Sequence, residues 1–371
     1  MSKKPGVHFR GLIGCMVGVA FLGACAGPEQ EGAEPAAVVA DSQEQDLRDV
    51  TVLLSVEKSA VSMRESAAVT VTLRNDGRHA VKMLRWYTPA EGLEEPLFEV
   101  TRDGAKVAFE GPHYKRPAAT EQDYLRLAPG ESLTRSVDLQ GAYDLSRSGN
   151  YSIRFSLGGS HAHDGQAETV RQLASNAVNL WIEGRPNTTL EALDVSATVT
   201  SNVAFSGRCS TTQQATLLDA LNAASAMADN STSYLNGTPG ATLRYTTWFG
   251  AYSLTNWNTA KTHFVAIKDA FDTKALTLDC SCKKSYYAYV YPNQPYKIYV
   301  CSAFWSAPMT GTDSKGGTLI HEMSHFTAVA GTDDHVYGQS GAKNLALTNP
   351  TNALNNADNH EYFAENTPFQ Q

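Results

Sequence analysis

The stretch Thr318-Leu-Ile-His-Glu-Met-Ser-His-Phe326 decides what the C-terminal half of this 371-residue chain is expected to be. Its histidines, His321 and His325, are four positions apart, and on a helix that spacing places both imidazoles on one face, within reach of a single metal ion. Glu322 lies beside them and can take a proton from a water molecule at such a site. The stretch therefore predicts a buried helix, over residues 312–329, that carries a zinc site for hydrolysis.

The rest of the C-terminal half also has a mainly helical pattern. Apolar residues recur at helical spacing over residues 211–234 and 254–271, and a last helix is expected over residues 351–365. Residues 274–302 are strand-like and rich in tyrosine, which is a good strand-forming composition. Residues 205–371 are therefore expected to form an α+β domain, mainly helical, with a small β-sheet.

Residues 49–184 show the pattern of short β-strands instead. Runs such as 50–56, 68–73 and 151–156 alternate or stay apolar and are rich in β-branched residues, and turn signals such as Asn75-Asp-Gly77 separate them. Several short strands at this spacing predict an all-β antiparallel sandwich, immunoglobulin-like in outline. We expect this sandwich to be a prosegment.

Residues 185–204 mark a change of composition, with Pro186, a run rich in threonine and serine, and few charges. This segment is expected to be the processing linker between the sandwich and the C-terminal domain. No lysine occurs between Lys115 and Lys261. An enzyme that cut strictly at lysine could therefore not cleave its own linker.

The first 25 residues have the features of a targeting sequence. A positively charged start precedes an apolar stretch, residues 11–24, which is too short to span a membrane as a mature helix. It ends in Leu22-Gly-Ala-Cys25, which resembles the bacterial lipobox, in which the cysteine is lipidated. The alternative is an ordinary cleaved signal peptide with a chance cysteine; both predict export. Residues 26–48 have the composition of a disordered tether.

Composition and charge argue against nucleic acid as a partner. The residues are 42% hydrophobic and 18% charged, as in globular proteins, and the length suits two domains. A net charge of −8 gives no general attraction to nucleic acid, and no basic patch argues otherwise. No apolar span follows the targeting sequence, so membrane contact is expected only through a lipid anchor at Cys25.

Four cysteines remain beyond the targeting sequence, all in the C-terminal half. They are Cys209, Cys280, Cys282 and Cys301. An even number in an exported chain predicts two disulfides. The alternative is a structural zinc site, but one residue between Cys280 and Cys282 is too tight a spacer for ligand pairs of that kind.

The third metal ligand decides the class of zinc enzyme. The positions at which one large class has a glycine and a histidine are occupied here by Ala328 and Gly331. A thermolysin-like site would take its third ligand from a later helix, where Glu361 and Glu365 are available. A nearer candidate is the aspartate pair in Gly331-Thr-Asp-Asp-His-Val-Tyr-Gly338.

The helix motif followed by Gly-Thr-x-Asp-x-x-Tyr-Gly resembles the aspzincin family, the deuterolysins and peptidyl-Lys metalloendopeptidases. The resemblance extends over residues 205–371 and implies a zincin-like fold. It implies that Asp334 is the third ligand of one catalytic zinc ion and that Tyr337 stabilises the oxyanion, whereas Asp333 would break the spacing of the motif. It also implies the disulfide pairs Cys209–Cys280 and Cys282–Cys301.

The C-terminal segment, residues 356–366, is similar to that of the peptidyl-Lys branch. In that branch an aspartate and a glutamate three positions apart form the pocket for the lysine that follows the cut bond, and they match Asp358 and Glu361 here. Two carboxylates around a pocket suit a compact ammonium group. The alternative is that both side chains only solvate the last helix.

How a prosegment would block the enzyme is less evident from the sequence. A cysteine switch is excluded, because no cysteine lies between Cys25 and Cys209. The run His161-Ala-His-Asp164 is a candidate for masking the zinc ion, although such a run is more often a polar loop.

Together these features predict an exported, lipid-anchored precursor of a zinc metalloendopeptidase that acts on proteins or peptides on the N-terminal side of lysine. The mature enzyme is expected to be an extracellular monomer. The alternatives are a thermolysin-like protease, or a lipid-anchored binding protein with an inactive protease domain. The glutamate of the motif, Glu322, argues against an inactive domain, since its loss would be the simplest way to abolish catalysis.

Overall fold

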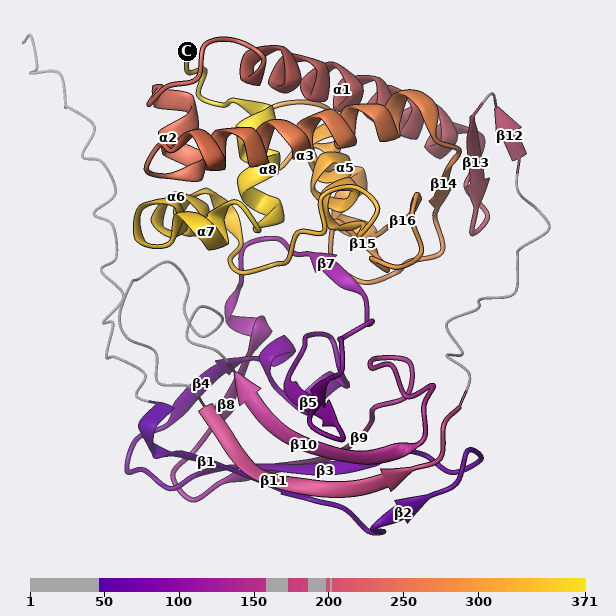
Figure 1. Ribbon diagram of the computed structural model, residues 1–371, viewed down its shortest axis with the longest axis vertical. Helices are drawn as coiled ribbons and strands as arrows, with labels where there is room; N and C mark the ends of the chain where they lie inside the picture. The colour runs from indigo at the N-terminus through magenta and orange to yellow at the C-terminus, as the bar shows by residue number, and fades with distance from the viewer. Residues whose placement is uncertain (1–46, 158–172, 186–197, 201) are drawn as a thin grey trace, which may run out of the picture. The chain divides into compact units, whose positions relative to one another are not determined.

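The computed structural model describes residues 47–157, 173–185, 198–200 and 202–371 (Figure 1). The chain divides into a unit formed by Met1–Glu44 and a unit formed by Gln45–Gln371, and the description below concerns the second unit. The predicted targeting sequence with Cys25 and the run His161-Ala-His-Asp164 lie outside the described residues.

The N-terminal part of the second unit consists of short strands. They are β1 (Val50–Ser55), β2 (Ala60–Val61), β3 (Ala68–Asn75), β4 (Val81–Leu84), β5 (Phe98–Arg102), β6 (Ala105–Lys106), β7 (His113–Lys115), β8 (Tyr124–Leu127), β9 (Ser132–Asp138), β10 (Gly149–Leu157) and β11 (Leu173–Ile182). The expected strands over residues 50–56, 68–73 and 151–156 are confirmed as β1, β3 and β10. Along β1 buried and exposed residues alternate, as the sequence pattern predicts for a strand with one face on a core.

All of these strands except β4, β7 and β8 form one sheet in the order β6-β5-β10-β11-β1-β3-β9, with β2 beside β11, and β4 and β8 form a separate pair. One shared core holds residues of β1 and β3 together with residues of β5 and β10, such as Leu54, Val71, Val100 and Ile153. The expectation of a purely antiparallel arrangement is wrong, because β11 runs parallel to both β1 and β2. The pairing of β1 with β11 joins the two halves of the sheet at one position, Val52 opposite Ser175. The immunoglobulin-like outline remains a prediction.

The C-terminal part contains helices and a small sheet, as expected. The elements are β12 (Thr198–Thr200), β13 (Val203–Ser206), α1 (Thr211–Leu235), α2 (Leu243–Phe249), α3 (Leu254–Thr273), β14 (Leu276–Asp279), β15 (Ala288–Val290), β16 (Lys297–Val300), α4 (Ser302–Ser306), α5 (Lys315–His325), α6 (Gly338–Thr348), α7 (Pro350–Ala353) and α8 (Ala357–Glu365). Helix α5 packs against α1 and α8, and α1 packs against α3 (Figure 1). None of the helices in the described part of the chain is long and apolar enough to cross a membrane.

Two of the expected helices have different bounds. The helix predicted over residues 312–329 is shorter, because the Ser314 side chain caps its start and Phe326 leaves the helical conformation at φ −57° and ψ 127°. The helix predicted over residues 351–365 is divided into α7 and α8, because Asn356 between them is extended.

Strand β7 lies at the edge of the sheet of the C-terminal part. The sheet of the C-terminal part runs β12-β13-β14-β16-β15-β7, so its edge strand comes from within residues 49–184. Strand β7 is antiparallel to β15, with Lys115 opposite Ala288 and His113 opposite Val290. On the other side of this sheet, β12 pairs with β13, and β13 pairs with β14.

The two disulfides are Cys209–Cys280 and Cys282–Cys301, the pairs that the resemblance implied. The first joins the segment before α1 to the end of β14. The second links the loop before β15 to the end of β16. It thus connects the two ends of the β15–β16 pair, and β15 is the strand that pairs with β7.

Candidate active site

Helix α5 carries the two histidines on a fully buried helix. Every residue from Lys315 to His325 is buried. The His321 and His325 side chains come from successive turns, and their Nε2 atoms lie 3.1 Å apart. The four-residue spacing thus places the two imidazoles side by side, as the sequence predicts.

Asp334 completes a group of three donors. Its Oδ1 lies 3.3 Å from His321 Nε2 and its Oδ2 lies 3.3 Å from His325 Nε2. The loop that carries Asp334 is held by the buried Asn356, whose Oδ1 accepts hydrogen bonds from the amides of His335, at 2.8 Å, and Val336, at 3.2 Å. The carboxylate is therefore positioned by the segment that separates α7 from α8.

The three side chains fit a zinc ion. Tetrahedral ligands at about 2.0–2.1 Å from zinc lie about 3.3 Å from one another, and the three donor separations here are 3.1, 3.3 and 3.3 Å. Both carboxylate oxygens of Asp334 are buried without a hydrogen-bond donor, and so are both oxygens of Glu322. Buried carboxylates without donors are costly, and a bound cation removes that cost.

Contacts behind the imidazoles fix the orientation of each ring. His325 Nδ1 lies 2.8 Å from the carbonyl oxygen of Thr332. His321 Nδ1 lies 2.8 Å from Oδ1 of Asp358. Partners of this kind leave Nε2 of each ring directed at the metal position and are typical of histidine ligands.

A second acidic group lies beside the first, on α8. The Asp358 and Glu361 side chains are fully buried and point to the ammonium group of Lys115 on β7, whose Nζ lies 2.6 Å from Glu361 Oε2 and 3.3 Å from Asp358 Oδ1. Asp313 Oδ1 also lies 3.4 Å from this nitrogen. Lys115 is 0% exposed. The carboxylates predicted to form a lysine pocket therefore surround a lysine of the same chain.

Aromatic rings complete this pocket. The Lys115 ammonium group lies 5.3 Å from the centre of the Tyr287 ring and 5.6 Å from that of Tyr362. Ring faces attract a cation within about 6 Å. Neither tyrosine, nor Asp313, was singled out from the sequence.

The two glutamates considered for a thermolysin-like site do not join the histidine Nε2 atoms. Glu361 Oε2 lies 3.4 Å from Nδ1 of His321, the nitrogen on the far side of the ring. Glu365 accepts hydrogen bonds from the amides of Ser314, at 2.8 Å, and Asp313, at 3.2 Å, and so supports the start of α5. Asp334 is the carboxylate that lies between the two Nε2 atoms.

Comparison with known proteins identifies the family. The aspzincin family described as lysine-specific metallo-endopeptidase matches residues 234–365. The extracellular protease of Aeromonas hydrophila is 51% identical over 313 residues, which cover 82% of this chain and 90% of that protein. The peptidyl-Lys metalloendopeptidase of Armillaria mellea is 38% identical over 334 residues, which cover 86% of this chain and 93% of that protein. The chain belongs to the aspzincin family.

Membership of this family makes the protein a zinc metalloendopeptidase. The matched residues contain α5, the Asp334 loop and α8. Among solved structures, a zinc peptidase from Grifola frondosa is 47% identical, with a TM-score of 0.43, and covers 44% of this chain and 100% of its own.

The electrostatics of this aspzincin site follow from its burial and its three carboxylates. Burial opposes a charge on His321, but Asp334, Asp358 and Glu361 together raise the pKa of its imidazole well above the usual value. Burial raises the pKa of Glu322 to about 7, although both histidines oppose the shift. A carboxylate with such a pKa is suited to accept and return a proton near neutral pH.

Tyr337 lies at the start of α6, three residues after Asp334. Its hydroxyl accepts a hydrogen bond of 2.9 Å from Nη1 of Arg116, the residue that follows β7. Arg116 is itself buried and is paired with Glu94 and Glu95. Burial, together with the charge of Asp334, raises the pKa of Tyr337, so the hydroxyl keeps its proton and can donate it in a hydrogen bond.

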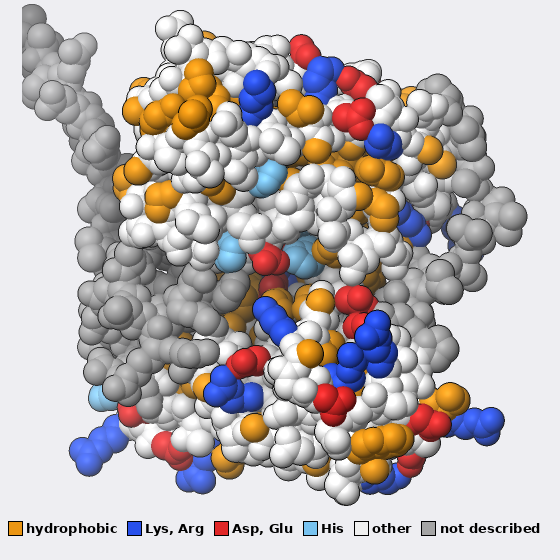
Figure 2. Space-filling model, viewed as in Figure 1, with side chains coloured by type: hydrophobic (Ala, Val, Ile, Leu, Met, Phe, Trp, Pro, Cys, Tyr) orange, Lys and Arg blue, Asp and Glu red, His pale blue; other side chains and the backbone are white. Residues whose placement is uncertain are grey.

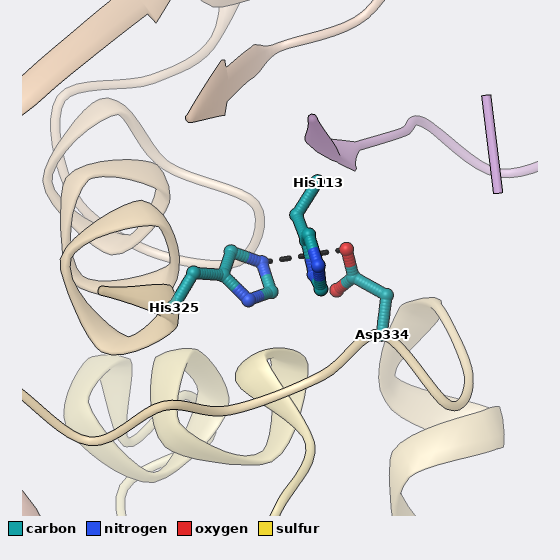
Figure 3. A group of neighbouring side chains, drawn as sticks. All are labelled: His113, His325 and Asp334. Carbon is teal, nitrogen blue, oxygen red and sulfur yellow. Dashed lines mark ion pairs between the residues drawn. The ribbon is translucent and has the colours of Figure 1, made fainter. Parts of the chain in front are cut away.

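His113 on β7 is a further residue that sequence analysis missed. Figure 3 shows its ring next to the His325 imidazole and the Asp334 carboxylate. A ligand atom of each of these three residues lies within 4.8 Å of the others. Burial and the neighbouring His325 lower the pKa of His113 to about 4, so the imidazole is neutral.

On the face in Figure 2, histidine and acidic side chains gather near the middle. The masking run predicted at His161 cannot be compared, because it lies outside the described residues.

Proposed function

We propose that this aspzincin is an exported endopeptidase that hydrolyses peptide bonds on the N-terminal side of lysine. His321, His325 and Asp334 would hold one zinc ion, which, when bound, lowers the pKa of a water molecule toward about 7 and polarises the scissile carbonyl. Glu322 takes the proton of the attacking water and gives it to the leaving amine. The Tyr337 hydroxyl donates a hydrogen bond to the oxygen that becomes negative.

The lysine preference is supported above all by the ion pairs of Lys115. An ammonium group that lies 2.6 Å from Glu361 and 3.3 Å from Asp358 fills the pocket beside His321. Two buried carboxylates next to a proposed metal site repel each other and attract a cation, and the rings of Tyr287 and Tyr362 attract it as well. The name of the Armillaria mellea relative, a peptidyl-Lys metalloendopeptidase, agrees with this preference.

Export is the second part of the proposal. Disulfides persist in oxidising compartments, and this chain has two. The extracellular protease of Aeromonas hydrophila is named for that location. Cys25 is proposed as the lipidated residue of a precursor at the bacterial cell envelope, from which a monomeric protease is released. The proposed organisation is a targeting sequence (1–25), a tether (26–48), a prosegment (49–184), a linker (185–204) and the protease domain (205–371).

A peptide-library digest tests the reaction and the preference together. The processed enzyme from the medium of an expressing bacterium is incubated with the library, with and without a zinc chelator, and the cut sites are determined by mass spectrometry. We expect chelator-sensitive cuts before lysine, and none from the Glu322→Gln variant prepared in parallel. Chelator-sensitive cuts without a lysine bias would reject the pocket assignment. Cuts that persist in chelator would reject the zinc mechanism.

A further inference from the structure

Strand β7 lies where an extended peptide could bind. It extends the sheet of the catalytic part by antiparallel pairing with β15, and the Tyr287 amide donates a hydrogen bond of 3.0 Å to the Lys115 carbonyl. Addition of a strand to a sheet edge is a common way for a protein to bind a peptide. Because side chains alternate along a strand, His113 and Lys115 share one face, and Tyr114 faces the other way, against Tyr286 and Tyr289.

Lys115 fixes the register of this strand. Its ammonium group has three carboxylates around it, from Glu361, Asp358 and Asp313, and no exposed surface. Displacement by two residues would place a different side chain in the pocket and leave buried carboxylates unpaired, which is costly. The strand is therefore held with His113 two residues before the pocket.

In this register His113 lies beside His325 and Asp334. Its side chain is 12% exposed, and its ring centre lies 4.8 Å from that of His325. A ligand atom of His113 lies within 4.8 Å of those of His325 and Asp334, which are two of the three residues proposed to hold the zinc ion (Figure 3).

The number of protein ligands separates catalytic from structural zinc sites. Catalytic sites have three protein ligands and an open position, whereas sites with four protein ligands are closed. A fourth ligand would leave no position for the attacking water. Arg116, next along the chain, is hydrogen-bonded to the hydroxyl of Tyr337, so the same segment also covers the group that would stabilise the oxyanion.

We propose that His113 is a fourth zinc ligand in the uncleaved chain, presented by a strand that Lys115 anchors in the lysine pocket. The N-terminal half thereby keeps the protease inactive until the segment is removed. This inference rests on the proposed function, since it takes the ligands and the lysine pocket from it.

X-ray absorption at the zinc edge counts the imidazole ligands directly. The full-length precursor carrying Glu322→Gln is used, because it lacks the proposed base for peptide hydrolysis, and mass spectrometry verifies that the segment is still attached. We expect three imidazoles in this protein and two after the additional substitution His113→Ala, with a zinc dissociation constant raised at least about tenfold. His79→Ala, which removes an exposed histidine of the sandwich, is the matched control and should still show three.

The outcomes separate the inference from the proposed function. A precursor that binds no zinc would reject the proposed metal site. Zinc bound by two imidazoles in the Glu322→Gln precursor would overturn the role of His113 and leave the proposed function standing. This imidazole count is made on the precursor that retains His113. It therefore tests the role of His113 even if the His113→Ala variant fails to fold.

A second experiment tests the anchor in chains that keep Glu322. Freshly purified precursors with Lys115→Met or Lys106→Met are given a lysine-containing peptide, and the initial rate is measured before any cleavage of the precursor is visible on a gel. Lys106 is exposed, so its variant should remain as inactive as the parent. Loss of the buried ion pairs should raise the initial rate about tenfold to hundredfold. Equal rates for the two variants, both folded by circular dichroism, would overturn the anchoring role.

Discussion

Two buried acidic sites meet at one histidine in this protein, and they differ in what neutralises them. At the proposed metal site, Asp334 lies against the Nε2 atoms of His321 and His325, and its oxygens have no hydrogen-bond donor. At the proposed lysine pocket, Asp358 and Glu361 lie on the Nδ1 side of the same His321 and are paired with Lys115.

The difference shows how neighbouring carboxylates can serve opposite purposes. Two imidazoles and one carboxylate at tetrahedral separations suit zinc, which accepts nitrogen and oxygen ligands at short distances. Carboxylates spread around a pocket with aromatic walls suit a larger organic cation that must enter and leave. His321 connects the two, so occupancy of the pocket can affect the basicity of a metal ligand.

Removal of one carboxylate from each site should have the largest effect. Asp334→Ala should reduce the zinc content and peptide hydrolysis of the purified enzyme to background, because two imidazoles alone hold zinc weakly. Glu361→Ala should retain one equivalent of zinc by elemental analysis.

Asp333→Ala is the control for this pair, since Asp333 is next in sequence but its side chain is 53% exposed. It should retain zinc. Full zinc content in the Asp334→Ala protein would assign the third ligand elsewhere.

The next largest effect separates metal binding from catalysis within the first site. Glu322→Gln keeps the shape of the side chain but removes the proton acceptor, so kcat should fall about 10²–10⁴-fold. Zinc content should not change, because Glu322 is not one of the three proposed ligands. A kcat within tenfold of the parent, measured with a fluorogenic lysine peptide, would contradict the role of Glu322 as base.

The sequence alone predicted the metal site better than the pocket. On any helix, the four-residue spacing of His321 and His325 places both side chains on one face, and Glu322 lies next to them in the sequence. The third ligand could be chosen among several carboxylates after the helix only through a family resemblance. Asp313, in contrast, lies in a loop before α5, and no local pattern connects it to α8.

His113 and Arg116 could not be predicted because they reach the site through a pairing that has no local signature. Strand β7 has three residues, and its partner β15 lies more than 170 positions away along the chain. The lysine-free interval after Lys115 was the one available hint, and it raised a question about processing without indicating a place in the fold.

In the fold too, elements with a local sequence pattern could be predicted, whereas contacts between distant parts of the chain could not. The alternating pattern of β1 and β3 predicted those strands, but the parallel β1–β11 contact depends on residues more than 100 positions apart. Helix α2 was missed because it buries an arginine, Arg244, whose guanidinium donates to the carbonyl of Phe363, at 2.7 Å from Nη2. A charged residue on the buried face conceals the helical pattern.

A substitution in the proposed lysine pocket should reduce the preference for lysine without abolishing peptide hydrolysis. Glu361→Gln removes one of the two buried charges next to the ammonium group, so kcat/KM for lysine peptides should fall about 10–100-fold. For peptides with methionine in place of lysine it should change little. Asp219→Asn, at an exposed position of α1, is the matched control. An equal loss for both peptides would show that Glu361 acts on catalysis, for instance through His321.

The pH profile should report the metal site rather than the pocket. Burial raises the pKa of Glu322 from 4.5 to about 7, and a cation bound beside it would lower that value again. Only the ionised form accepts a proton, so kcat/KM should fall about tenfold per unit as the pH drops below an apparent pKa between these limits. Protons that compete for His321 would act in the same direction. Activity that stays constant down to pH 4 would contradict this assignment.

Asp313→Asn should have the smallest effect. The side chain is 39% exposed and its oxygen lies 3.4 Å from the ammonium group, so water screens part of the attraction. A reduction of kcat/KM for lysine peptides by about two- to fivefold is expected. A loss as large as that of Glu361→Gln would make Asp313 an equal member of the pocket.

Anomalous diffraction at the zinc edge, from crystals of the full-length Glu322→Gln protein grown with zinc, tests the separate roles of the two sites most directly. One peak is expected, among His321, His325 and Asp334, with the Lys115 ammonium group between Asp358 and Glu361. A peak between Asp358 and Glu361, or no peak near Asp334, would contradict it.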